Sequence, residues 1–153
     1  YTTVIDYAAV NNKELENFYP AFKAVKDYVV QAPEKTTGWY LPSIGQWYDF
    51  TANLGGLPSW DDAINEGNDL TPNLYRWSNQ TELVSKINAY FEPLGTGNYD
   101  AIPNGSYQKF FSSSTYSDSG IWTWFVGKQA NVVQCWHNVR YNSDSAVRPI
   151  LAF

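Results

Sequence analysis

The last third of the chain alternates short aromatic segments with turn-forming residues, and this feature most constrains the fold. Residues 110–114 (FFSSS) and 121–125 (IWTWF) have the aromatic and β-branched composition of strands. Ser, Asp, Asn and Gly residues separate these segments and favour turns. The chain finishes on the apolar segment 147–153 (VRPILAF). We expect this last segment to return to the body of the domain as a core strand, and the turns to face outward.

The N-terminal half carries the periodicity of helices instead. Apolar residues recur at helical spacing from position 18, and Pro20 is compatible with a first helical turn. The pattern predicts a helix that ends before Pro33. Its expected buried residues are Phe18, Phe22, Val25 and Val29. Residues 1–10 are β-branched and aromatic, which predicts an opening strand.

Two further helices are expected before the strands begin. Ser43 and Gln46 have the spacing of a capping box, so residues 38–54 are predicted to form a turn and then a helix that Gly55-Gly56 ends. The buried stripe of this helix should include Ile44, Trp47 and Leu54. A third helix is predicted from Thr81 to Phe91, and its expected buried residues are Leu83, Ile87 and Tyr90.

Helices in the N-terminal half and short antiparallel strands in the C-terminal half predict an α+β fold. The length of 153 residues suffices for one domain with a substantial core, so we expect a single domain over residues 1–153. Because the chain begins at Tyr1, we also expect it to be the C-terminal part of a longer surface protein.

Composition argues against several functional classes. The formal net charge is -5 and the ten basic residues are scattered, whereas nucleic-acid binding needs clustered Lys and Arg. No apolar run is long enough for membrane insertion. One Cys and one His cannot supply a structural zinc site. The acidic residues Asp61, Asp62, Glu66 and Asp69 fit no EF-hand loop, so no metal is expected, although calcium dependence stays open. Binding through aromatic and short polar side chains needs no cofactor. No convergent set of titratable residues favours an enzyme.

Strand alternation predicts which side chains of residues 121–126 are exposed. If Trp122, Trp124 and Val126 point into the core, then Ile121, Thr123 and Phe125 point outward. An exposed apolar row favours a binding patch, and the alternative is burial under the glycine-rich segment 94–107. Trp39, Trp47 and Trp122 are expected in the core.

The turns and strands beside this row are rich in Tyr, Ser, Asn and Trp, the composition of adaptable protein-binding surfaces. We therefore expect a ligand-binding face and no catalytic or metal-ligating residues. The predicted ligand-binding residues are Tyr116, Asp118, Ile121, Thr123, Phe125, Gln134, Trp136, Asn138, Tyr141, Asn142 and Ser143.

Residues 38–47 (GWYLPSIGQW) resemble the G-W-x-L-P-[ST]-x-x-[EQ]-W signature of C-type-lectin-like bacterial surface domains. These domains are allied to the Fibrobacter major paralogous domain and, more remotely, to formylglycine-generating enzymes. The second half matches as well, and the resemblance covers most of residues 18–153. The matching features are Phe110-Phe111, the serines 112–114, the strand 121–126, Arg140 and the ending 147–153.

The ending after a turn-rich segment is also similar to that of the variable proteins of diversity-generating retroelements, which occur in gut bacteria and their phages. In such proteins the changes concentrate on the exposed face of a lectin-like fold. The resemblance implies a rigid scaffold that presents a ligand surface at the exterior of a cell or phage particle. The paired active cysteines of formylglycine-generating enzymes are missing, since Cys135 is the single cysteine.

The sequence therefore predicts a non-enzymatic recognition module, an adhesin or receptor-binding domain, possessing a C-type-lectin-like fold. Its expected partner is a protein or glycan on another cell or surface. Its expected location is extracellular or at the cell surface, either anchored to an outer membrane or on a phage particle. The alternatives are a structural module of a surface or pilus-like assembly and, less favoured, an enzyme related to formylglycine-generating enzymes.

Overall fold

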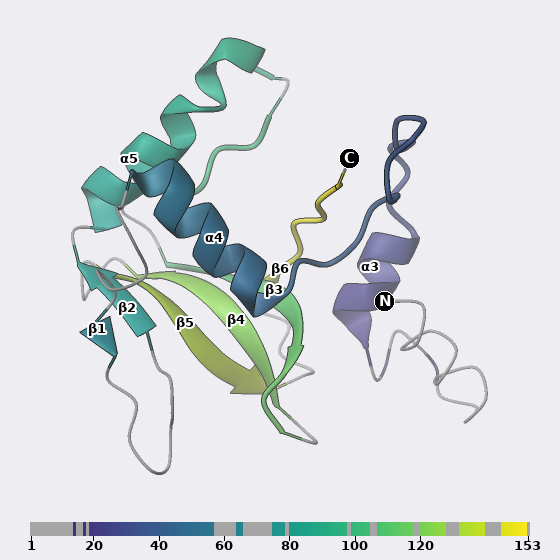
Figure 1. Cartoon of the computed structure of the whole chain (residues 1–153). Coiled ribbons are helices and arrows are strands. Elements are labelled where there is room, and N and C mark those ends of the chain that lie inside the picture. Colours follow the sequence, from purple (N-terminus) through teal and green to yellow (C-terminus); the bar gives the residue numbers. More distant parts are fainter. Residues whose placement is uncertain are drawn as a thin grey trace. The chain divides into compact units, whose positions relative to one another are not determined.

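Helices precede most of the strands along the chain, as expected for an α+β protein (Figure 1). The computed structural model describes residues 14, 17, 19–56, 64–65, 75–78, 80–97, 99–104, 107–117, 120–127, 132–139 and 145–152, some of them within strands by their backbone alone. The elements are α3 (Pro20–Lys26), α4 (Ile44–Gly55), β1 (Ile64–Asn65), β2 (Tyr75–Ser78), α5 (Gln80–Ala89), the 3₁₀ turn η2 (Glu92–Leu94), β3 (Gln108–Thr115), β4 (Gly120–Gly127), β5 (Val132–Val139) and β6 (Ser145–Ala146).

The strands follow the order β1-β2-β5-β4-β3-β6 in the sheet. β1 pairs antiparallel with β2, and β2 pairs antiparallel with β5. The links from β3 to β4 and from β4 to β5 are far too short for a parallel crossover, so these neighbours are antiparallel as well. The α+β prediction is confirmed, whereas β1 and β2 are strands that the sequence pattern did not indicate.

The chain divides into two compact units, each described here by itself. Unit 1 comprises Tyr1–Ile44, Phe110–Thr123 and His137–Phe153, and unit 2 comprises Gly45–Lys109 and Trp124–Trp136. The strands β3, β4 and β5 contribute residues to both. The expectation of a single domain over the whole chain stays a prediction.

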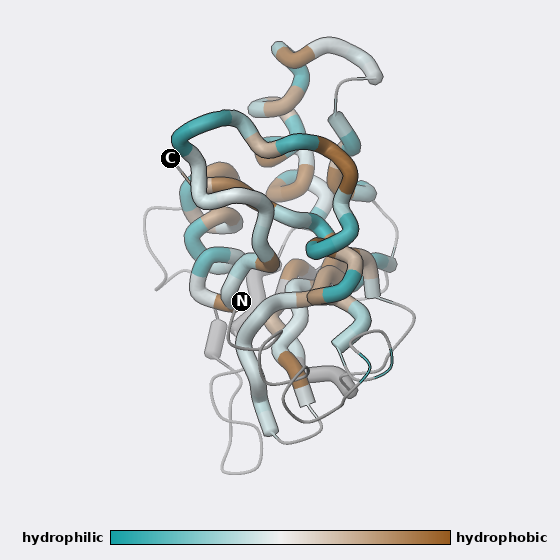
Figure 2. Tube along the Cα trace, turned by 90° about the vertical axis from the view of Figure 1, so that its right-hand side faces the viewer, coloured by the Kyte–Doolittle hydropathy of each residue, from teal (hydrophilic) through white to brown (hydrophobic). Residues whose placement is uncertain are grey.

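The core of unit 1 forms around α3. The helix begins with Pro20 in its first turn, as predicted, and buries Ala21, Phe22 and Val25. These side chains form one apolar cluster with Leu41, Phe111 and Ile121. Figure 2 shows hydrophobic and hydrophilic residues interspersed along the described part of the chain.

The helix ends before Pro33 as predicted, but the expected place of Val29 on its buried stripe is wrong. The helix ends at Lys26, and Val29 is 93% exposed instead of buried. The physical reason is a tertiary hydrogen bond: the indole Nε1–H of Trp39 donates to the carbonyl of Val30 at 2.6 Å and holds this segment outside the helix. Tyr28 packs edge-on against the same indole, with ring centroids 5.1 Å apart.

The C-terminal segment returns to unit 1 as predicted, but as an isolated bridge and not as the expected core strand, and its residues 147–152 are half-buried. Tyr40 and Ile150 exchange two backbone hydrogen bonds, of 3.0 and 2.9 Å, and form an antiparallel bridge. The Thr37 N–H donates to the carbonyl of Ala152 at 3.0 Å. The segment around the Gly38-Trp39 motif and the end of the chain therefore pair with each other.

The serine run 112–114 joins β3 to its neighbours within unit 1. The Ser112 hydroxyl donates to the carbonyl of Trp122 at 2.7 Å, and the Ser113 N–H donates to the carbonyl of Pro42 at 2.8 Å. Ser114 Oγ accepts the N–H of Ile44, the first residue of α4, at 3.0 Å. That N–H has no partner within its own helix, so Ser114 satisfies a donor that would otherwise be unpaired.

Unit 2 is built on an aromatic cluster between α4 and β4. The rings of Trp47 and Trp124 stack with centroids 4.9 Å apart and planes within 3° of parallel. Phe50 packs edge-on against both indoles. The Trp124 Nε1–H donates to Thr51 Oγ1 at 2.8 Å, and the Thr51 hydroxyl donates to the Trp47 carbonyl at 2.7 Å. The buried Trp124 N–H and the Thr51 hydroxyl are therefore both hydrogen-bonded, as buried polar groups generally are.

The sequence predicts where both helices of unit 2, α4 and α5, end and which of their residues are buried. α4 ends at Gly55, and Gly56 takes a positive φ of 69°, so the predicted glycine stop is confirmed. α5 buries Leu83 and Ile87 as expected, but the predicted burial of Tyr90 is wrong. The N–H of Tyr90 bonds the carbonyl of Ile87, three residues back, and this tightened last turn carries Tyr90 out of the buried stripe.

Replacing Thr51 with Val should lower the free energy of unfolding by about 1–3 kcal/mol, because the buried Trp124 N–H loses its acceptor. Urea denaturation measures the change. Thr51→Ser keeps the hydroxyl and should recover much of the stability, while Thr115→Val at an exposed position should stay within about 0.5 kcal/mol of the parent. Equal stability of Thr51→Val and Thr115→Val would contradict this role for the hydroxyl.

Candidate functional site

Two members of the predicted outward row on β4 are buried. Ile121 is 4% exposed and Thr123 is 0% exposed, so the prediction that they point outward is wrong, and neither side chain is open to a ligand in this structure. Ile121 belongs to the α3 cluster with Phe22 and Leu41. The alternation argument assumed that one face of β4 meets solvent, but β4 lies between β3 and β5 and buries residues on both faces.

The inward residues follow the prediction in part. Trp124 and Val126 are fully buried, and Trp47 is in the core as expected. Trp122 and Trp39 are half-buried, so their predicted place in the core is confirmed only in part, by the packing of Trp39 against the core cluster of unit 1. Trp122 lies near the start of β4, where the strand leaves the turn, and this position leaves part of its indole open to solvent.

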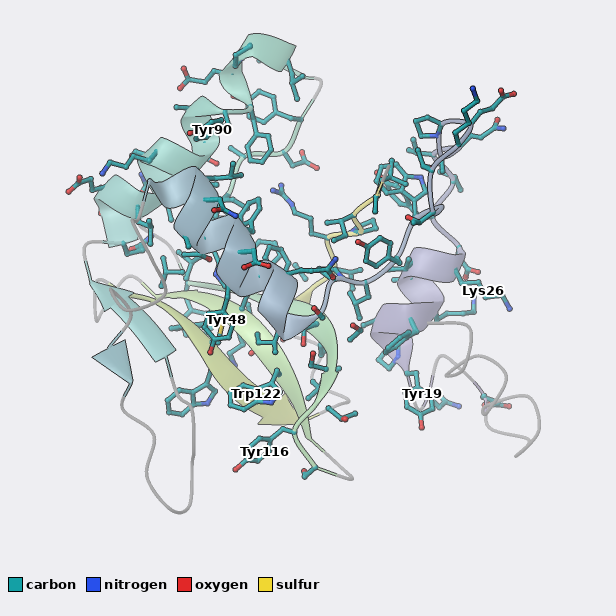
Figure 3. The ribbon with its side chains drawn as sticks, viewed as in Figure 1. Tyr19, Lys26, Tyr48, Tyr90, Tyr116 and Trp122 are labelled. Carbon is teal, nitrogen blue, oxygen red and sulfur yellow. The ribbon has the colours of Figure 1, made fainter. Side chains whose placement is uncertain are left out.

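The exposed part of Trp122 meets Tyr116 at the turn between β3 and β4. The two rings are edge to face, with centroids 5.3 Å apart and planes at 88°. Figure 3 shows both side chains together at this end of the strands. Tyr116 was predicted as a contact residue, and it is half-buried here. We name Tyr116 and Trp122 the turn pair.

Backbone hydrogen bonds and Gly120 position the turn pair. The N–H of Tyr116 donates to the carbonyl of Gly120 at 3.1 Å, and the N–H of Gly120 donates to the carbonyl of Ser117 at 3.2 Å. A Cβ at Gly120 would lie 2.8 Å from Ser117 Oγ and 3.2 Å from Tyr116 Cδ1. Glycine therefore lets the tyrosine ring pack closely against the start of β4.

In unit 2, Phe125 follows the alternative prediction. It is half-buried, and its ring packs edge-on against Tyr107, with centroids 4.8 Å apart. Tyr107 follows directly on the segment 94–106 and belongs to the glycine-rich stretch that was expected as the alternative cover. Trp136 on β5 remains 39% exposed, as its predicted role requires.

The other predicted contact residues cannot be placed by their side chains. Gln134 and Asn138 lie in β5, where Gln134 pairs with Arg76 of β2, but the structure describes only their backbone. The remaining four lie outside the described residues: Asp118, Tyr141, Asn142 and Ser143.

Sequence reasoning missed Trp122 and Tyr107 as surface-forming residues, and Gly120 as the residue that lets the turn pair pack closely. A signal for Gly120 was available, since it ends the polar turn Ser117-Asp118-Ser119 directly before a strand. A signal for Tyr107 was its spacing of two from Lys109, which places both on one face of an extended segment. Nothing local could have shown that Trp122 is half-exposed.

The one cysteine is buried in unit 2 beside α4. Burial away from water raises the pKa of the Cys135 thiol far above its ordinary value, and a hydrogen bond with Tyr48 opposes this only in part. Tyr48 lies on α4 (Figure 3). A thiol held in its protonated form is a poor nucleophile and a poor metal ligand, so Cys135 acts as a packing residue.

Among the residues that the structure describes, no group of three or more His, Cys, Asp or Glu side chains could hold a metal ion. Within the same part of the chain, no helix has the length and apolar character needed to cross a bilayer. Comparison of the chain with known protein-family models, curated proteins and solved structures finds no match.

The buried thiol predicts a pH dependence of stability. Below about pH 8 the thiol is protonated in both states, since the unfolded pKa is about 8.5. Above it the unfolded chain loses the proton while the native chain keeps it, so unfolding becomes more favourable by up to about 1.4 kcal/mol per pH unit. Urea denaturation between pH 7 and 10 should therefore show a steeper decline for the parent than for Cys135→Ala. Parallel declines would contradict burial of the thiol.

Proposed function

We propose that the chain is a non-enzymatic recognition domain that binds a protein or glycan on another cell or surface through the turn pair. The main observation in favour of this proposal is that Tyr116 and Trp122 form a partly exposed aromatic pair on a turn fixed by backbone hydrogen bonds. Tyr and Trp are the residues that most often dominate binding energy at interfaces. Such a prearranged pair loses little conformational entropy when a ligand binds.

The fold of this module is proposed to be C-type-lectin-like. In support, the two segments that carry the resemblance are hydrogen-bonded to each other, through Tyr40 and Ile150. The serine run also has a structural role in contacting residues 38–47. The Ser113 N–H donates to the Pro42 carbonyl, and Ser114 Oγ accepts the N–H of Ile44. A location at the surface of a cell or phage particle follows from the same resemblance.

The same hydrogen bonds bear on the alternative of an enzyme. The hydroxyl of Ser112 donates to a backbone carbonyl, and that of Ser114 accepts the first N–H of α4. These serines therefore have structural roles, and the thiol of Cys135 is buried. Recognition accounts for the exposed aromatic residues without requiring a reaction.

A structural module within a larger assembly is the second candidate. The observation in its favour is the exposed apolar segment Tyr28-Val29-Val30, since clustered apolar residues on a surface mark contact sites. The two candidates require different surfaces. Recognition depends on the turn pair, whereas assembly depends on this segment.

Binding of the fluorescently labelled chain to a panel of bacterial and epithelial cells, scored by flow cytometry, tests recognition. Tyr116→Ala and Trp122→Ala should each weaken binding about 30-fold, the factor for 2 kcal/mol at a binding hot spot. Tyr90→Ala removes an equally aromatic but unrelated exposed residue and should bind as the parent does. If Val29→Asp weakens binding to cells while Tyr116→Ala and Trp122→Ala do not, the assembly candidate is favoured.

Sequencing the same locus across many isolates tests the finer proposal, diversification by a retroelement. Substitutions should concentrate at partly or fully exposed positions such as Tyr116, Ser117 and Trp136. Ile121, Thr123 and Trp124 should stay constant because they are buried. A constant segment throughout would indicate a fixed adhesin or assembly module. Substitutions as frequent at Ile121 as at Tyr116 would contradict selection on the surface.

A further inference from the structure

A second surface lies on the sheet within unit 2, on the face away from α4. Trp124 stacks on Trp47 and Cys135 bonds Tyr48, so both point toward α4. Because side chains alternate along a strand, Phe125 and Trp136 point to the opposite face. β4 and β5 are neighbours in the sheet, so the two aromatic residues lie on adjacent strands of one face.

Aromatic side chains remain open to solvent here. Tyr107 is 60% exposed and Trp136 is 39% exposed. Tyr107 packs against Phe125 at an interplanar angle of 75°, which fixes the direction of its ring. Aromatic residues gathered on one face and held in place mark a contact surface, because isolated exposed apolar residues are normal but clusters are not.

Lys109 adds a positive charge to this face. Its ammonium group lies 5.3 Å from the centroid of the Tyr107 ring, in a cation–π contact. Among the described residues no carboxylate forms an ion pair with Lys109, although the whole chain carries a net charge of -5. The ring holds the ammonium group but accepts no conventional hydrogen bond, so its N–H donors can bind an incoming acceptor.

We propose that Tyr107, Lys109, Phe125 and Trp136 form a docking surface for a protein segment that presents a carboxylate beside an apolar side chain. The carboxylate would pair with Lys109, and the apolar side chain would pack on the exposed aromatic rings. Charge complementarity decides the chemistry of the partner, and the aromatic composition is that of protein-binding hot spots. This surface uses none of the residues of the turn pair, so the inference does not depend on the proposed function.

The ring geometry favours a peptide over a glycan. A sugar ring stacks on a flat, open aromatic face, but Lys109 lies over the Tyr107 ring and Phe125 stands nearly perpendicular to it. What remains open is a set of ring edges beside a cation. Aliphatic and aromatic side chains pack well against such edges.

Selection from a phage-displayed library of random 12-residue peptides tests the proposal. The immobilised 153-residue chain serves as bait, and a Tyr107→Ala/Lys109→Gln double variant removes peptides that bind elsewhere. Enriched peptides should carry Asp or Glu within two residues of an aromatic or aliphatic side chain. Their affinity, measured by fluorescence anisotropy with synthetic peptide, should fall as salt rises.

Single substitutions test whether the selected peptides bind at Tyr107 and Lys109. Lys109→Gln and Tyr107→Ala should each weaken peptide binding about tenfold, and Lys109→Arg should retain it because the charge remains. Lys86→Gln, at an exposed lysine paired with Glu82, is the matched control and should change nothing. Trp122→Ala should also bind normally, which separates this surface from the turn pair. Circular dichroism melting curves check that each variant folds.

Four outcomes would overturn the proposal. The selection could enrich no peptide, or only peptides without Asp or Glu. Alternatively, Lys109→Gln and Lys86→Gln could bind the peptide with equal affinity, or Trp122→Ala could abolish peptide binding while Tyr107→Ala does not. Glycan-array binding that depends on Lys109, without peptide binding, would assign the surface to a carbohydrate instead.

Discussion

The stacked indoles of Trp47 and Trp124 are the contact on which the arrangement of unit 2 depends. They join α4 to β4, and Thr51 pairs the one polar atom of the Trp124 ring with the helix backbone. Once Trp124 points toward the helix, alternation places Phe125 on the other face. Cys135 repeats the same constraint on β5 through Tyr48 and leaves Trp136 outward. The proposed docking surface is therefore a consequence of how the core is packed.

Local physical chemistry made a useful part of this fold predictable. Pro20 indicated the first turn of α3, and the glycine pair after α4 indicated its end, where Gly56 takes a positive φ. The return of the chain's end to the body of unit 1 also followed from its apolar character, although its partner Tyr40 did not. Each of these predictions depends on a few neighbouring residues, or on the general tendency of apolar segments to leave water.

Most of the incorrect predictions concern contacts beyond the local pattern, whereas the exposure of Tyr90 follows from the tightened last turn of its own helix. On β4, Ile121 is covered by a helix a hundred residues earlier in the chain, so no local pattern could show its burial. The exposure of Val29 likewise depends on the hydrogen bond from Trp39 to Val30. Of the candidate site, Tyr116, Phe125 and Trp136 kept at least partial exposure, whereas Ile121 and Thr123 did not.

The two aromatic surfaces differ in chemistry, and this difference predicts different partners. The turn pair stands beside short polar residues such as Ser117, a composition that adapts to many ligands through hydrogen bonds and ring contacts. The surface around Tyr107 carries a lysine whose charge selects an acidic partner. Variation at the turn can change the ligand without disturbing a core formed by Trp47, Thr51 and Trp124. Under the two proposals, such a domain changes what it recognises at the turn and keeps its contact with an acidic protein segment.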